Sequence, residues 1–373
     1  MKNKIHNYDF LVIGAGLIGS LTAIALLKNK HKVLVIDKNR KFPKDNRTLA
    51  VNANSKDFLT ELGIWNKLKT NPEPINKIEI NDTINKSPLI FENIKEEMGN
   101  VILNKDLLKE VKQLLLKKQL LIEEINIEIS KIKTGQEIKI KNKNYIFKKI
   151  ILCLGKNYDN DAIIKKFSFP SLHKSYVGFF DHSIVHNQTA HETFTPDGPL
   201  AVLPAPSKLK KTSTFIYSTP IQVSDTDIQK LIKNYFSKTH GFINFKKEIY
   251  QYKILPHLSK EKLHQFILIG DILRSIHPVA GQGWNLGIKD IQKFITLLNQ
   301  YDIEDPKILD KYYSHRSIEN FTYLTFTSLI NKIYEDQNPL NNAIIKGGFG
   351  ILKRSSFLKS TFIKQAMGRL NLI

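Results

Sequence analysis

The chain has very little cysteine and few long apolar runs. Cys153 is the single cysteine among 373 residues. One thiol cannot form an internal disulfide, so a disulfide framework is excluded and a reducing compartment is expected. A chain of this length can bury a full core, and neither internal repeats nor a low-complexity linker divides it. We therefore expect two interleaved domains.

One apolar run approaches the length of a membrane span. Residues 10–27 are 18 residues without a charge, and lysines precede them. This composition superficially fits a signal peptide or a short transmembrane segment. However, glycines at regular spacing interrupt the run, a strand-like segment follows it, and no small-residue cleavage site ends it. We therefore expect a soluble protein of the cytoplasm, or one peripheral on the inner membrane.

Acidic residues are scarce relative to basic ones. The chain has 35 Asp and Glu against 56 Lys and Arg, for a formal net charge of +21. No basic block lies beside aromatic stacking residues, so nucleic acid is not an expected partner. Asn and Ile are abundant together with Lys, which favours biased codon usage as the cause of the charge. The alternative is attraction to anionic lipid, at about 1 kcal/mol for each basic residue near the surface.

A glycine-rich turn near the N-terminus carries a strong local pattern. A strand-like run over residues 9–13 leads into Gly14-Ala15-Gly16-Leu17-Ile18-Gly19, and a helix and a second strand ending at Asp37 follow. Gly14 would make the tight turn, Gly16 would admit a pyrophosphate, and Gly19 would let the helix pack on the strand. Asp37 is placed to accept hydrogen bonds from an adenosine ribose. The pattern predicts a dinucleotide-binding βαβ unit.

A second glycine-rich loop lies in the last third of the chain. It reads His277-Pro278-Val279-Ala280-Gly281-Gln282-Gly283-Trp284-Asn285-Leu286-Gly287 and follows a strand-like run closed by Gly270-Asp271. Its glycines and proline prevent a regular helix until about Asn285. Such a loop can bring bare backbone against a flat ligand and direct a helix N-terminus at it. With the first turn, it predicts a site that spans both halves of a dinucleotide.

The remaining segments alternate between helical and strand-like patterns. We expect an amphipathic helix ending at residues 62–65, a small β excursion over residues 72–92, and a helix over residues 104–119. Strands are expected over residues 121–129, 136–140 and 145–154, an antiparallel sheet over residues 175–255, and helices from about residue 290 onward.

Six motifs are spread over nearly the whole chain. They are Asp45-x-Arg47-x-x-Ala50, Leu62-Gly63-Ile64-Trp65, Phe194-Thr195-Pro196-x-Gly198-Pro199-Leu200-Ala201-x-Leu203-Pro204, His277-Pro278-x-Ala280-Gly281-Gln282-Gly283-x-Asn285-Leu286-Gly287, Tyr312-x-x-x-Arg316 and Ala366-Met367-Gly368. Together they resemble one family, the ubiquinone-biosynthesis hydroxylases among the FAD-dependent aromatic-ring monooxygenases.

The resemblance implies an α/β fold in which a Rossmann-type FAD-binding domain is interleaved with an antiparallel β-sheet substrate domain, followed by a helical C-terminus. The FAD-binding domain would comprise residues 1–72, 93–165 and 262–300. The substrate domain would comprise residues 73–92 and 166–261, and the helical region residues 301–373.

The resemblance also assigns cofactor-binding residues. The ADP half of FAD would be held by Gly14, Gly16, Gly19 and Asp37. Arg47 would lie near the pyrophosphate and the flavin, and Lys105 stands where the family usually has Arg. Asp271 would bind the ribityl chain. No metal site is expected.

The flavin ring would lie along the second glycine-rich loop. The residues implied there are Pro278, Gly281, Gln282, Gly283 and Asn285, with His277 and Pro278 as the candidate catalytic residues. The dipole of the following helix would stabilise negative charge on the N1/O2 edge of the reduced flavin.

Two motifs depart from the family pattern. Where A-D-G-x-x-S is usual, the chain reads Cys153-Leu154-Gly155-Lys156-Asn157-Tyr158. Where Gly-Asp-Ala-Ala-His is usual, it reads Gly270-Asp271-Ile272-Leu273-Arg274. The acid of the first motif is associated with FAD and NAD(P)H handling. Its loss implies less efficient reduction of the cofactor, whereas the residues of the flavin site itself are retained.

The resemblance implies an enzyme that hydroxylates the aromatic ring of a polyprenylated ubiquinone precursor. FAD would take a hydride from NAD(P)H, react with O2 and transfer one oxygen atom to an electron-rich ring. Two alternatives are a catalytically weakened flavoprotein that acts as a scaffold, and an FAD-dependent reductase of isoprenoid lipids. Expected partners are the polyprenylated phenol, other quinone-biosynthesis proteins and a membrane surface met by the basic and apolar residues 347–360. Candidate residues for lining the substrate cavity are Phe179, Phe180, Phe215 and Tyr217.

Overall fold

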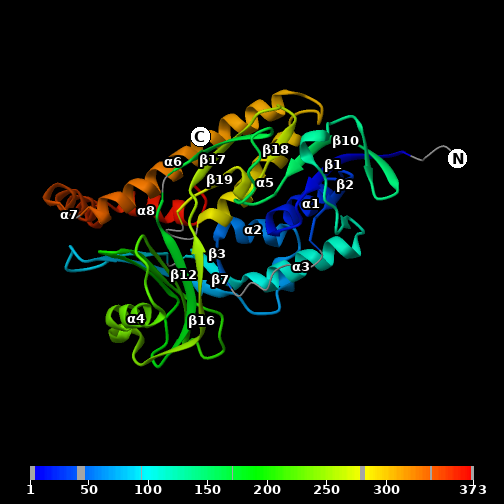
Figure 1. Ribbon diagram of the computed structural model, residues 1–373. Coiled ribbons are helices and arrows are strands. Elements are labelled where there is room, and N and C mark those ends of the chain that lie inside the picture. The colour runs from blue at the N-terminus through cyan, green and yellow to red at the C-terminus, as the bar shows by residue number, and fades with distance from the viewer. Residues whose placement is uncertain are drawn as a thin grey trace.

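The structure of the chain is a computed structural model that describes residues 5–39, 47–93, 95–169, 171–277, 282–336 and 338–370, without the side chains of residues 247 and 248. These residues form two large sheets, one at each end of an elongated molecule (Figure 1). Helices from the C-terminal third bridge them.

The first sheet is largely parallel and surrounds the first strand of the chain. Its order is β18-β10-β1-β2-β8, and β9 pairs with β10 in the antiparallel sense. The central strands are apolar without alternation, as expected where helices cover both faces of a parallel sheet. The strands are β1 (Ile5–Ile13), β2 (Val33–Ile36), β8 (Leu121–Ile122), β9 (Glu137–Ile140), β10 (Lys143–Leu152) and β18 (Phe266–Leu268).

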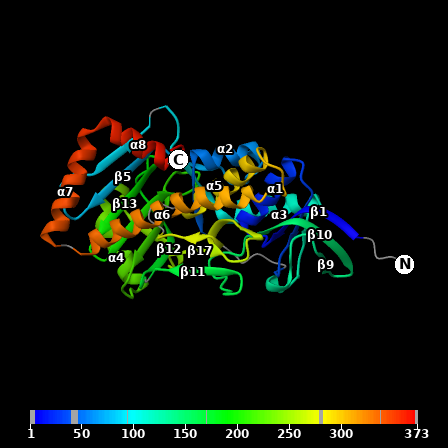
Figure 2. The same ribbon diagram turned by 90° about the horizontal axis from the view of Figure 1, so that it is seen from above.

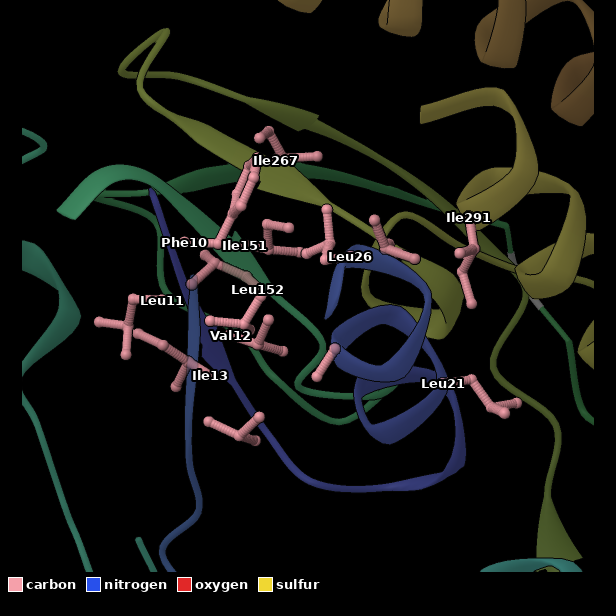
Figure 3. Close-up of a cluster of buried hydrophobic side chains, with 14 of the residues drawn as sticks. Phe10, Leu11, Val12, Ile13, Leu21, Leu26, Ile151, Leu152, Ile267 and Ile291 are labelled. Atoms are coloured by element: carbon pink, nitrogen blue, oxygen red, sulfur yellow. The ribbon is translucent and has the colours of Figure 1, made fainter. Parts of the chain in front are cut away.

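Three helices pack on this sheet: α1 (Leu17–Lys28), α3 (Asn104–Lys117) and α5 (Gln282–Leu298). Figure 3 shows how side chains of β1, β10 and β18 meet those of α1 and α5, with Phe10, Ile151, Leu26 and Ile291 among them. Each such side chain contributes about 1.5–3 kcal/mol by leaving water. This core fixes the carboxyl ends of the parallel strands, where the predicted site lies.

The second sheet is mainly antiparallel, in the order β16-β12-β15-β14-β13-β5-β6. Helix α4 (Asp225–His240) covers one face, on the side away from α1 and α5 (Figure 1). Ser224 and Asp227 form a capping box at its start. The strands are β5 (Lys77–Asp82), β6 (Leu89–Glu92), β12 (Lys174–His182), β13 (Thr189–Thr195), β14 (Gly198–Pro204), β15 (Thr212–Thr219) and β16 (Ile243–Lys253).

The C-terminal helices and several short elements connect the two sheets. Helix α6 (Lys307–Glu335) runs from beside α5 to α7 (Pro339–Arg354), as Figure 2 shows, and α8 (Ser356–Ala366) follows. The smaller elements are α2 (Ala53–Glu61), β3 (Thr48–Asn52), β4 (Glu73–Ile75), β7 (Gly99–Leu103), β11 (Ile164–Ser168), β17 (His257–Glu261), β19 (Arg274–Ser275) and the 3-10 turns η1 (Trp65–Lys67), η2 (Ile129–Lys131) and η3 (Gly270–Ile272).

The predicted fold class is confirmed: a mixed α/β protein with a parallel sheet, an antiparallel sheet and a helical C-terminus. Three local predictions differ from the structure. The strand expected over residues 121–129 is limited to β8, helix α4 interrupts the expected sheet, and α5 begins at Gln282 rather than near Asn285. Among the described residues, no helix is long and apolar enough to cross a membrane.

Candidate functional site

The turn after β1 has the geometry that its glycines predict. Gly14 has φ +103°, and a Cβ there would lie 2.4 Å from the carbonyl oxygen of Cys153. A Cβ on Gly19 would lie 1.9 Å from the carbonyl oxygen of Gly14, so α1 packs directly on the turn. A Cβ on Gly16 would meet nothing within 4 Å. The backbone is therefore closed around Gly14 and Gly19 and open at Gly16, at the N-terminus of α1.

Asp37 lies directly after β2 and faces this turn. Its Oδ2 accepts a hydrogen bond from the Ala15 N–H at 2.6 Å, and its Oδ1 accepts one from the Asn39 N–H at 2.7 Å. A carboxylate has about four lone-pair sites, so both oxygens can accept further bonds. The carboxylate thus holds the glycine turn and retains capacity for ribose hydroxyls.

The two glycine-rich segments meet at the side chain of Ile18. A Cβ on Gly270 would lie 3.0 Å from Cγ2 of Ile18, and a Cβ on Gly287 would lie 2.7 Å from its Cδ1. The start of α1, the turn after β18 and the start of α5 are thus in contact, although more than 250 residues separate the first from the last. The two predicted halves of the dinucleotide site form one site.

Charged groups surround Asp271, in η3 at the carboxyl end of β18. The side chain is exposed to solvent, yet the surrounding protein desolvates it enough to raise the pKa of its carboxyl, while the charges of Arg274, Lys156 and Arg47 act in the opposite direction. Lys156 was not predicted as a site residue, although it lies in the segment Cys153–Tyr158, which differs from the family's usual motif. The Arg47 guanidinium lies 5.1 Å from the ring centroid of Tyr252.

Lys105 is exposed in the first turn of α3, and its neighbour Asn104 is hydrogen-bonded to the backbone of Arg47. The Asn104 N–H donates to the Arg47 carbonyl at 3.0 Å, which brings the two segments together. The binding roles of Arg47 and Lys105 stay predictions.

The first turn of α5 is fixed against β3 by Asn285. Its Nδ2 donates to the Ala50 carbonyl at 2.9 Å, and its Oδ1 accepts from the Asn52 N–H at 3.1 Å. Gln282 begins the helix, and a Cβ on Gly283 would meet nothing within 4 Å. Pro278 and Gly281, predicted to lie along the flavin, are outside the described residues.

A buried ionic network underlies this site. Asp290 of α5 is fully buried; its Oδ2 accepts from Arg274 at 2.5 Å and from the Gly270 N–H at 3.0 Å, and its Oδ1 accepts from Arg316 at 2.6 Å. Arg316 and Lys289 also contact Glu319. The Arg274 that departs from the family pattern thus holds the Asp271 turn against α5 and α6. The sequence carried a signal for Asp290, because an acid in the apolar stripe of a helix requires a partner.

His277 is buried beside the segment before β12. Its Nε2 lies 3.2 Å from Nδ1 of His173, whose Nε2 lies 2.7 Å from the Glu335 carboxylate at the end of α6. Burial lowers the pKa of His277 to about 3. Sequence reasoning missed His173 and Glu335, and nothing in the sequence links them to the glycine-rich loop.

The aromatic residues expected to line a substrate cavity divide between two faces of the second sheet. Phe180, Phe215 and Tyr217 are fully buried against α4, so for them the prediction is wrong and they are sheet core. Phe179 has the opposite orientation. It pairs with Thr214, whose hydroxyl lies 3.5 Å from that of Thr48 on β3, so it faces the nucleotide-binding half.

These residues fit an FAD molecule. The open space at Gly16 adjoins the N-terminus of α1, which favours phosphate. The acceptor Asp37 contacts this turn at Ala15, and the glycines of η3 and α5 contact the start of α1 at Ile18. The arrangement can bind an extended dinucleotide across the carboxyl ends of the parallel strands.

Comparisons with known proteins indicate an FAD-binding chain. Residues 7–135 match the FAD binding domain family, and residues 227–369 match the squalene epoxidase family. The ubiquinone biosynthesis monooxygenase COQ6 of Dictyostelium discoideum is 23% identical over 98% of this chain and 92% of its own length. The ubiquinone hydroxylase UbiL of Rhodospirillum rubrum is 23% identical over 98% of this chain and 90% of its own length.

Solved structures share the fold. The p-nitrophenol 4-monooxygenase PnpA of Pseudomonas putida has a TM-score of 0.73 at 13% identity, covering 98% of this chain and 100% of that one. PqsL, a probable FAD-dependent monooxygenase of Pseudomonas aeruginosa, has a TM-score of 0.70 at 13% identity, covering 92% of this chain and 100% of that one. Fold, site and relatives define an FAD-dependent monooxygenase. The chain is similar over nearly its whole length to the ubiquinone-biosynthesis hydroxylases.

Proposed function

We propose that this protein hydroxylates the aromatic ring of a polyprenylated ubiquinone precursor, with FAD as its cofactor, NAD(P)H as electron donor and O2 as co-substrate. The observation that carries the proposal is the likeness to ubiquinone hydroxylases over 98% of the chain. The contact of the two glycine-rich segments at Ile18 supports it, because it builds one site able to hold a whole dinucleotide.

The residues around the site have distinct tasks in this proposal. The turn Gly14–Gly19 and the amino end of α1 hold the pyrophosphate, and Asp37 holds the adenosine ribose. Asp271 binds the ribityl chain, with Arg47 and Lys156 supplying positive charge nearby. Bound FAD supplies hydride acceptance and oxygen activation, and the protein supplies position, exclusion of water and charge stabilisation.

The flavin-facing loop completes the proposed site. In the sequence, His277 and Pro278 stand at its start and Gly281 at its end, and Gln282, Gly283 and Asn285 lie in the first turn of α5. The dipole of α5 favours negative charge at its amino end. Because Asn285 holds β3, the position of this amino end depends on that strand.

A prenylated substrate gives the protein reason to work at a membrane surface. Apolar side chains on α6, α7 and α8 are exposed, namely Phe321, Phe326, Leu329, Leu340, Ile344, Ile351 and Phe357. Basic residues lie among them, including Lys346, Arg354 and Lys359. We propose peripheral contact with an anionic membrane through this C-terminal surface, and assembly with other quinone-biosynthesis proteins. Similarity of residues 227–369 to the squalene epoxidase family supports a lipid substrate.

The experiment is to delete this protein from its cell and identify the accumulated quinone intermediate. We expect a prenylated phenol lacking one ring hydroxyl, which the purified FAD-loaded protein converts with NAD(P)H and O2. An intact quinone pool in the deletion strain would overturn the proposal. Restoration of quinone synthesis by a variant unable to bind FAD would instead indicate a scaffold.

A further inference from the structure

The C-terminal motif Ala366-Met367-Gly368 closes α8 and packs on the connection from β3 to α2 (Figure 2). The Met367 carbonyl accepts a hydrogen bond from the Asn54 N–H at 3.0 Å. Gly368 has φ +72°, and a Cβ there would lie 2.4 Å from Nδ2 of Asn52 and 2.9 Å from its Cγ. The proposed function gives these contacts no task, although they reach the strand that holds the start of α5.

Asn52 cannot turn away from Gly368. It ends β3, is buried, and caps α2 with its side chain, because its Oδ1 accepts from the Ser55 N–H at 2.9 Å. Rotation of the amide would break this cap and leave a buried N–H without its acceptor. A side chain at residue 368 would therefore displace Asn52 as a whole, including its backbone.

The backbone of Asn52 holds the first turn of α5. Strand β3 is at the edge of its three-stranded sheet, in the order β3-β7-β4. The Asn52 N–H donates to Oδ1 of Asn285 at 3.1 Å, and the Ala50 carbonyl accepts from its Nδ2 at 2.9 Å. The Asn285 amide thus pairs with β3 as the peptide group of a neighbouring strand would. A shift of Asn52 would move Asn285 with it.

Two further contacts tie the same region to α5. The side chains of Asn54 and Gln292 exchange hydrogen bonds at 2.8 Å and 3.3 Å. The Leu370 carbonyl accepts from Nζ of Lys289 at 3.3 Å. Residues 285, 289 and 292 recur at helical spacing and so share one face of α5. The β3–α2 connection and residues 366–370 together hold that face.

We propose that Met367 and Gly368 are positioning residues that hold the amino end of α5 against the flavin, acting through β3. This inference rests on the proposed function, in which that end faces the flavin ring. The amino end of a helix favours negative charge, and the flavin gains negative charge on reduction. The C-terminal motif thus raises the reduction potential of bound FAD by keeping α5 in place.

Two glycines with the same backbone conformation provide a matched pair of variants. Gly368→Ala places a methyl group against Asn52. Gly135 has φ +73°, and a Cβ there would meet nothing within 4 Å. Gly135→Ala therefore carries the same backbone strain without displacing a neighbour, so any difference between the two variants reports the displacement of Asn52.

The first measurement needs no cofactor. Trp284 lies in the first turn of α5, and Trp65 is the other tryptophan of the chain. In a Trp65→Phe background all tryptophan emission comes from Trp284. We expect Gly368→Ala to change the quenching of this emission by acrylamide, because the first turn moves, and Gly135→Ala to leave it unchanged. Identical quenching in the two variants would overturn the proposal.

The second measurement is the midpoint potential of bound FAD, from a spectroscopic titration with a reference dye. In Gly368→Ala we expect the equilibrium constant for reduction to fall about tenfold, which lowers the potential of a two-electron couple by about 30 mV. Gly135→Ala should match the unaltered protein. Asn54→Ala removes the contact with Gln292 and adds no atom, so it should lower the potential by less and remains informative if Gly368→Ala does not fold.

A compensating change tests whether the effect passes through Asn52. Serine also caps helices, is shorter than asparagine, and keeps the backbone N–H that Asn285 accepts. In the double variant Gly368→Ala with Asn52→Ser, the added methyl group has room, so the potential should return toward that of the unaltered protein. A potential that stays low would contradict the route through Asn52.

One more variant separates this inference from the proposed function. Gln282→Glu places a negative charge in the first turn of α5 and should lower the potential wherever that turn faces the flavin. No response to Gln282→Glu would contradict the proposed placement of the flavin. A response to Gln282→Glu with unchanged potentials in Gly368→Ala and Asn54→Ala would overturn the positioning role alone.

Discussion

The guanidinium of Arg274 lies against the buried carboxylate of Asp290, with 2.5 Å between Nη1 and Oδ2. Arg316 contacts the other oxygen of the same carboxylate. Arg274 stands where the family usually has histidine, so from the sequence alone the change resembles decay of the motif. In the structure it links the Asp271 turn to α5 and α6. The departure is therefore a different way of holding the same turn.

Removal of this arginine should destabilise the protein strongly. Arg274→Met leaves a buried carboxylate with one cation fewer, and breaking a buried pair costs about 3 kcal/mol or more. Urea unfolding of the FAD-loaded protein measures the change in the free energy of unfolding. Arg369→Met is the control, because it breaks an exposed ion pair with Glu96 and Asp57 and should cost less than about 1 kcal/mol. Equal losses in the two variants would contradict this account of Asp290.

A side chain at Gly16 should prevent FAD binding without unfolding the protein. The backbone there has φ −63° and open space around it, so Gly16→Val fits the fold but occupies the space expected for the pyrophosphate. We expect the purified variant to be colourless and its dissociation constant for FAD to rise by at least about a hundredfold, or roughly 2.7 kcal/mol. Gly347→Val, also in open space but on α7, should retain yellow flavin. A yellow Gly16→Val protein would mean that the pyrophosphate lies elsewhere.

Acid should destabilise the second sheet through its buried histidines. Burial, then His191, lowers the pKa of His240 from 6.5 to about 3, and burial lowers that of His186 to about 4. Below pH 6.5 the unfolded chain binds protons that the folded protein excludes, so stability is full above 6.5 and is lost as the pH falls toward 4. The loss is about 1.4 kcal/mol per pH unit for each histidine.

The variant His240→Phe keeps a ring in the contact with Phe180 and Phe236 and removes the titrating group. The free energy of unfolding, measured in urea at several pH values between 4 and 6.5, should depend less steeply on pH in this variant. The exposed His264, changed to Asn, serves as control. An unchanged slope in His240→Phe would show that the acid sensitivity has another origin.

Two adjacent phenylalanines of β12 should have different roles. Phe180 is fully buried against α4, so Phe180→Ala should cost about 3–5 kcal/mol of stability. Phe179 faces the nucleotide-binding half, so Phe179→Ala should leave stability nearly intact and raise KM for a prenylated phenol roughly tenfold, which corresponds to about 1.4 kcal/mol. Thermal unfolding and steady-state kinetics on the same preparations separate the two effects. Similar kinetics in Phe179→Ala and the unaltered protein would show that the substrate does not bind at this face of the sheet.

The C-terminal surface should bind anionic vesicles. Flotation with vesicles containing anionic lipid is expected at low salt and should weaken at high salt, because the Debye length falls from about 10 Å at 0.1 M to about 3 Å at 1 M. Arg354→Gln with Lys359→Gln should reduce flotation. Lys353 is the comparison within the same segment, because its Nζ already donates to Ser87 and a change there should affect flotation less. Equal flotation with neutral and anionic vesicles would contradict the electrostatic part of the proposal.

The sequence was sufficient for features that depend on neighbours in the chain. The turn Gly14–Gly19 and the strands around it follow from a contiguous pattern, and their geometry is as predicted. Helix α4 was missed although its pattern was readable, because Ile228, Ile232 and Phe236 recur at helical spacing after a Ser224 cap. We predicted an antiparallel sheet over all of residues 175–255, and this prediction ignored the helical spacing of the apolar residues within it.

Contacts between distant segments could not be predicted in the same way. His173 and His277 are separated by 104 positions, and their contact depends on how the second sheet packs on the loop after β19. Likewise, the two faces of β12 are distinguished by α4, so the roles of Phe179 and Phe180 could not be separated without knowing that helix. Periodicity determines which residues share a face and leaves open what covers it.

The bond from the Asn54 N–H to the Met367 carbonyl joins the start of α2 to the segment after α8 at 3.0 Å. A Cβ on Gly368 would collide with Asn52, so this packing is close. The segment after α8 therefore completes the packing around β3 and α2, so truncation of the chain before Met367 should loosen the nucleotide-binding half at a point far from its glycine-rich turn.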